Sequence, residues 1–81
     1  MKRSTDQIPE LVDQIRPILA FKPPQVQSGV LADLTALWLA GVWIKDEPAQ
    51  TRLLRAELLD LYLELVKQLT EVNARMLGTD H

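Results

Sequence analysis

The side chains best suited to chemistry in this sequence are the acidic residues of its last third. Asp60 and Glu64 lie four residues apart, and Glu57 and Glu71 fall on the same side of a helix with 100° per residue. Clustered carboxylates bind divalent cations. Metal sites between helices, however, add histidines to such glutamates, and the only histidine is His81, the last residue. Because basic side chains share this arc, we interpret it as a solvated face that holds neither a metal nor a cofactor.

Nucleophilic catalysis has equally little support in the sequence. There is no cysteine, and the two serines, Ser4 and Ser28, have no histidine nearby that could activate them. The three glycines are scattered, so no phosphate-binding loop is present. We therefore expect a protein that is not an enzyme.

The charge distribution also argues against a nucleic-acid partner. The net charge is −2, and the basic residues are spread along the chain. Arg52 and Arg55 form the only close basic pair of the last segment, and Glu57 lies close by, two residues after Arg55. Binding to a phosphate backbone requires a basic patch or stripe, so we expect no nucleic acid.

Prolines divide the sequence into three segments, and hydrophobic residues make up 47% of it, enough for a folded chain. We predict a single helical domain over residues 1–81, with helices over about 6–16, 24–45 and 47–77. A proline-rich joint over residues 17–24 separates the first two helices, because Pro17 lacks the backbone N–H that a helix needs there. Asp46 is the expected N-cap of the last helix, and Gly78 is its expected stop.

The middle segment reads VLADLTALWLAGVWI over residues 30–44 and is almost entirely apolar. A membrane-spanning helix needs about 20 consecutive apolar residues, and extending this segment brings in polar or charged residues at both ends. A helix that is apolar all round is also explained by burial among other helices. We expect the second explanation, and a small membrane-associated protein is the alternative.

Asp33 stands within this apolar segment and has two interpretations. In the first, Asp33 belongs to an exposed strip of small residues with Gly29, Ala36 and Ala40. In the second, it is buried, where an unpaired carboxylate is prohibitively costly. The buried carboxylate would then pair with one of three arginines, namely Arg16, Arg52 or Arg55.

The last segment has an apolar surface that is too wide for one neighbouring helix. Its main seam advances in steps of three and four residues, as in a heptad repeat, through Leu54, Leu58, Leu61, Leu65, Leu69, Val72 and Met76. A second apolar set lies beside it and contains Leu59, Tyr62, Leu63, Val66 and Leu77. Together the two sets cover about 200° of the helix, whereas one partner needs a stripe of about 100°. This helix therefore needs at least two neighbours.

These patterns predict an all-α protein in which a short N-terminal helix precedes a long antiparallel helical hairpin. We expect the hairpin to form a helical bundle by dimerisation, so that the chain is a non-catalytic interaction or assembly module in the cytoplasm. Its partner is a second copy or another helical protein, and monomeric three-helix packing is the alternative architecture. A ligand-binding bundle with an apolar pocket near Trp38, Trp43 and Tyr62 is the alternative function. The expected interaction residues are Leu59, Tyr62, Leu63, Val66, Trp38 and Trp43.

Overall fold

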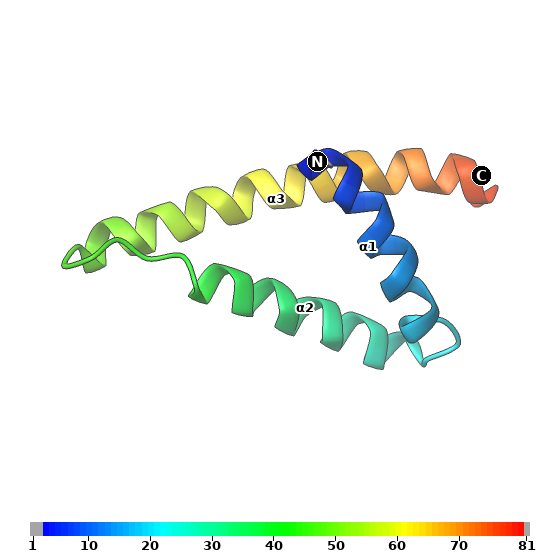
Figure 1. Cartoon of the computed structure of the whole chain (residues 1–81), viewed down its shortest axis with the longest axis horizontal. Coiled ribbons are helices and arrows are strands. Elements are labelled where there is room, and N and C mark those ends of the chain that lie inside the picture. Colours follow the sequence, from blue (N-terminus) through cyan, green and yellow to red (C-terminus); the bar gives the residue numbers. More distant parts are fainter. Residues whose placement is uncertain (1–2, 81) are drawn as a thin grey trace. The chain divides into compact units, whose positions relative to one another are not determined.

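The chain consists of three α-helices in the computed structural model, which describes residues 3–80 (Figure 1). Helix α1 spans Ser4–Leu19, α2 spans Pro24–Ala40 and α3 spans Pro48–Leu77. No β-strand occurs anywhere in residues 3–80. The predicted all-α class with three helices is therefore confirmed.

The first helix is longer than the sequence predicts, because it continues through Pro17 to Leu19. Pro17 removes one helical donor, the one that would bind the carbonyl of Asp13. The turn beyond it still forms, since the N–H of Ala20 donates to the carbonyl of Arg16 at 2.9 Å. Asp13, Arg16 and Pro17 are all exposed. Solvent can therefore satisfy the unpaired carbonyl, and a proline at this position is tolerated.

Two features define the joint between α1 and α2. The side-chain amide of Gln27 donates to the carbonyl of Leu19 at 2.9 Å and so satisfies a carbonyl at the end of α1. Phe21 adopts a left-handed backbone conformation with φ of 67°, and its side chain is fully exposed. This conformation is unfavourable for a residue with a Cβ atom.

Replacing Phe21 with glycine is expected to leave the chain at least as stable, with a gain of up to about 1 kcal/mol. The left-handed conformation costs a non-glycine residue roughly 1–2 kcal/mol, and the greater flexibility of glycine offsets about half of that gain. The free energy of unfolding in urea measures the effect. Phe21→Ala is the matched control, since it removes the ring and keeps the strained backbone. A larger loss of stability for Phe21→Gly than for Phe21→Ala would contradict the strain argument.

The second helix ends earlier than predicted, at Ala40 rather than near residue 45. The N–H of Gly41 closes the last turn on the carbonyls of Leu37 and Trp38, and residues 41–47 form a non-helical connection. Side chains of α3 bind backbone groups of this connection, as described below. These hydrogen bonds favour the non-helical connection over continuation of the helix. Their partners are distant in sequence, so the local pattern of residues does not reveal them.

The third helix matches its predicted extent within one residue. Its N-cap is Glu47 rather than the predicted Asp46, and Pro48 occupies the first helical turn. Asp46 instead adopts a left-handed conformation with φ of 63°, which aspartate tolerates better than most residues. Gly78 ends the helix with φ of 73°, and its N–H donates to carbonyls of the last turn. The predicted glycine stop is confirmed.

The chain divides into two compact units, Met1–Leu34 and Thr35–His81, and the boundary falls within α2. Among residues 3–80 no hydrophobic side chain is buried, and the one buried residue is Thr51. Half-buried side chains gather where the end of α2 meets the start of α3 in the second unit. They are Thr35, Leu39, Val42, Leu54, Arg55, Leu58 and Tyr62.

Neither α2, the most apolar of the three helices, nor any other helix within residues 3–80 combines the length and the hydropathy that crossing a bilayer requires.

Candidate functional site

Thr51 anchors the connection between α2 and α3. Only 7% of its surface is exposed. Its hydroxyl oxygen accepts the N–H of Ile44 at 2.9 Å and lies 2.9 Å from the carbonyl of Glu47 and 3.3 Å from that of Ile44. A hydroxyl has one hydrogen to donate, so this hydrogen is held by the two carbonyls. Thr51 is therefore a structural clamp, and its hydroxyl is not free to act as a nucleophile.

Replacing Thr51 with valine, which has the same shape, is expected to destabilise the chain by about 1–3 kcal/mol. The change leaves the Ile44 N–H without its partner in a half-buried place and removes a hydrogen bond to backbone carbonyls. Thr51→Ser keeps the hydroxyl and is the control, with a smaller loss. Unfolding in urea at equal protein concentration measures both variants. Equal losses would indicate that the methyl group, and not the hydroxyl, makes the contribution.

Arg55 forms the second tie between α3 and the end of α2. Its Nε donates to the carbonyl of Val42 at 2.9 Å, and one terminal nitrogen donates to the carbonyl of Ala40 at 3.0 Å. The last carbonyls of a helix lack backbone donors, and a positive charge at this end also interacts favourably with the helix dipole. Arg55 therefore caps α2 from a position on another helix.

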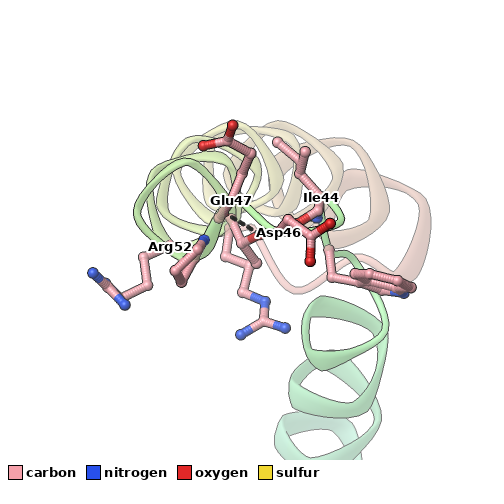
Figure 2. Close-up of a pocket in the computed structure, with 8 residues that line it drawn as sticks. Ile44, Asp46, Glu47 and Arg52 are labelled. Carbon is pink, nitrogen blue, oxygen red and sulfur yellow. Dashed lines mark hydrogen bonds between the residues drawn. The ribbon is translucent and has the colours of Figure 1, made fainter.

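An open depression of about 420 Å³ lies over this connection (Figure 2). Its lining combines two acidic residues, two arginines and an aromatic ring, and consists of Trp43, Ile44, Asp46, Glu47, Pro48, Thr51, Arg52 and Arg55. In Figure 2 the Arg52 side chain extends away from Ile44 and Asp46, while Arg55 is held by backbone carbonyls. The lining charges are of both signs, and in Figure 2 the side chains of Asp46, Glu47 and Arg52 extend in different directions.

The structure separates the aromatic residues that the sequence grouped around one apolar pocket. Trp38 and Tyr62 contact each other with ring centroids 5.6 Å apart, in a tilted arrangement. The hydroxyl of Thr35 lies 3.2 Å from that of Tyr62. Trp43 lies elsewhere, at the depression beside Arg55. The lining of this depression therefore includes Trp43 but neither Trp38 nor Tyr62.

The other predicted interaction residues lie on the exposed side of α3. Leu59, Leu63 and Val66 keep between 37% and 47% of their surface exposed. These three residues lie on one side of α3, adjacent to the side of α3 that contacts α2. Tyr62, which the sequence places in the same set, is instead half-buried between Trp38 and Thr35. Leu61, assigned to the main seam by its spacing, is exposed, so the packed face of α3 passes through Tyr62 rather than Leu61.

Asp33 is exposed, and so are the small residues Gly29, Ala36 and Ala40. This exposure within one chain agrees with the interpretation as an exposed strip of small residues, and the pairing of Asp33 with an arginine stays a prediction, because Asp33 lies in the first unit and both Arg52 and Arg55 lie in the second. Of the three proposed partners, Arg16 and Arg52 are exposed. The third, Arg55, donates to the backbone carbonyls at the end of α2.

The acidic arc of α3 is exposed at Glu57, Asp60, Glu64 and Glu71. Within residues 3–80 no group of three or more histidine, cysteine, aspartate or glutamate side chains has an arrangement that could hold a metal ion. His81, the only histidine, lies outside the described residues.

Comparison of the chain with known protein families, with curated proteins and with solved structures finds no match.

Proposed function

We propose that this chain is a non-catalytic assembly module that associates with a second copy of itself to form a two-fold dimer. One observation carries the proposal: among residues 3–80 no hydrophobic side chain is buried. Burial of apolar surface is the main favourable term in folding and in most association. A chain with 47% hydrophobic residues, of which those within residues 3–80 are at most half-buried, gains this term by covering its exposed faces with another molecule.

The part of the chain that holds its own shape is proposed to be an antiparallel helical hairpin. Its support is the order of the contacts in the second unit. Thr35 lies by Tyr62, the carbonyl of Val42 accepts from Arg55, and the N–H of Ile44 donates to Thr51. From one contact to the next, the residue number rises on the α2 side and falls on the α3 side, which is the pattern of antiparallel neighbours.

This hairpin would associate with the hairpin of a second copy through its exposed helical surface and so form a helical bundle. A two-fold dimer is the simplest closed assembly, because the same surface of each copy is buried against the other. The cytoplasmic location remains a prediction from the sequence alone.

The mass of the full chain in solution tests this proposal. Size-exclusion chromatography with light scattering, over a series of protein concentrations, is expected to give twice the 9.2 kDa of one chain at high concentration. The mass is expected to fall towards that of one chain on dilution. A mass of 9.2 kDa at every concentration would overturn self-association.

A further inference from the structure

One face of α3 is covered in its first half and open in its second. Six apolar positions follow each other in steps of four, three, four, three and four residues, the spacing of a heptad seam. They are Leu58, Tyr62, Leu65, Leu69, Val72 and Met76. The first two are half-buried where α3 meets α2, whereas the last four keep between 45% and 74% of their surface exposed. We name Leu65, Leu69, Val72 and Met76 the open seam.

We propose that the open seam pairs with the open seam of a second copy in the opposite direction. This inference rests on the proposed self-association and specifies its interface. The spacing of the open seam, four–three–four, reads the same in both directions. An antiparallel partner therefore aligns every position: Leu65 packs against Met76 of the second copy, and Leu69 packs against Val72 of the second copy.

The charges beside the open seam favour this antiparallel pairing. Glu64, Gln68, Glu71 and Arg75 form a polar strip along one flank of the open seam. In the antiparallel pair the two-fold axis passes the midpoint between residues 70 and 71, so Arg75 lies next to Glu64 and Gln68 of the second copy. The two-fold symmetry produces the same contact a second time. In a parallel, in-register pair the polar strip of one copy lies against the opposite flank of the open seam in the second copy, where Val66 and Asn73 carry no charge. The antiparallel arrangement thus gains two opposite-charge contacts between Arg75 and Glu64, which outnumber the one like-charge approach of Glu71 to Glu71 of the second copy at the two-fold axis.

The position of α2 favours the same arrangement. Tyr62 packs on Trp38 of α2, so the seam towards the start of α3 is already occupied. A parallel pair that continued along the seam would compete with α2 at this point. An antiparallel pair uses only residues 65–76, and the first halves of the two α3 helices then extend in opposite directions with their α2 contacts intact.

The other amphipathic helix of the chain, α1, is less suited to the open seam. Pro9 and Pro17 lie inside α1, and Pro17 removes a backbone hydrogen bond within the last half of the helix. A helix weakened at this point is a poor partner for a seam of four successive positions. α3 has no proline after Pro48. A second α3 therefore offers the more regular surface, and packing by α1 becomes one outcome of the test.

Cysteine cross-linking of the full chain tests the register, because the chain contains no cysteine of its own. Leu65→Cys and Met76→Cys are made separately, and one of them carries a tag so that mixed dimers differ in mass. The variants are mixed under reducing conditions, and mild oxidation follows. The expected product is the mixed disulfide, with little product from either variant alone. Lys67→Cys mixed with Ala74→Cys is the matched control, since these positions lie at similar heights on the opposite side of α3 and should not cross-link.

Light scattering of the reduced variants shows whether the chain self-associates, independently of whether the open seams pair in the antiparallel register. A dimer that gives Leu65→Cys homodimers would indicate parallel pairing and would overturn this inference while self-association stands. A dimer without cross-links through either position would place the interface on another face, with the same consequence. A monomer without cross-links would overturn both proposals, with α1 as the remaining candidate to cover the open seam. Leu69→Cys mixed with Val72→Cys tests the inner pair of the seam. It must give the same cross-linking result as Leu65→Cys mixed with Met76→Cys.

Discussion

Replacing Leu69 and Val72 together with glutamate is expected to convert the proposed dimer into a monomer. Both residues occupy the centre of the open seam, where each new carboxylate would be buried against an apolar side chain without a partner. The two-fold dimer contains each substitution twice, so four changes that cost at least about 1 kcal/mol each should raise the dissociation constant roughly a thousandfold or more. Sedimentation equilibrium over a dilution series measures this constant directly.

Lys67→Glu provides the matched control for this pair of substitutions. It changes the net charge by the same amount, because a positive side chain becomes negative, and Lys67 lies on the exposed side of α3 away from the open seam. Its new repulsion with Glu64 and Glu71 should cost only a few tenths of a kcal/mol. An unchanged dimer for Leu69→Glu with Val72→Glu, or equal weakening by Lys67→Glu, would rule out the open seam as the interface.

Replacing Arg55 with glutamine is expected to destabilise the second unit by about 2 kcal/mol. Arg55 donates two hydrogen bonds to carbonyls near the end of α2, and bonds from a charged donor contribute more than neutral ones. One of the bonds is exposed, which reduces its contribution. Urea unfolding followed by tryptophan fluorescence suits this measurement, since Trp38 and Trp43 flank the affected carbonyls in sequence.

Arg52→Gln is the control, because Arg52 is an exposed arginine one turn earlier on the same helix. Its loss should change the unfolding free energy by less than about 0.5 kcal/mol. Both variants are compared at one protein concentration, so that linked association does not distort the difference. Similar losses for the two arginines would show that general charge, rather than capping of α2, accounts for the effect.

The parts of this fold that the sequence predicts well are those governed by local chemistry. Pro24 and Pro48 each begin a helix, since the fixed φ of proline suits the first turn. Gly78 ends α3 because glycine adopts the left-handed conformation without strain. The long run of helix-forming residues between Pro48 and Gly78 contains no breaker, so the bounds of α3 follow directly from the sequence.

The predictions that failed depend on contacts between residues far apart in the chain. The end of α2 at Ala40 involves Arg55, and the conformation of residues 41–47 involves Thr51. Local propensity contains no information on either contact. The passage of α1 through Pro17 also depends on exposure, because a solvated carbonyl needs no helical donor.

The candidate site shows the same division. The exposed apolar residues Leu59, Leu63 and Val66 follow from the width of the apolar surface on α3, which one neighbour cannot cover. Thr51 and Arg55 were not recognised as the residues that hold the connection. A signal was present, because both polar residues fall on the same side of α3 as Leu58, and a polar residue on an apolar face is informative.

The lack of buried hydrophobic side chains among residues 3–80 has a consequence for calorimetry. The heat capacity increase on unfolding comes mainly from apolar surface that becomes hydrated. An isolated chain should therefore melt with an increment well below the usual value of about 12–15 cal/mol/K per residue, over a broad range of temperature. Where copies associate, melting also exposes to water the apolar surface buried between them. The melting temperature should then rise with protein concentration, and the transition should sharpen.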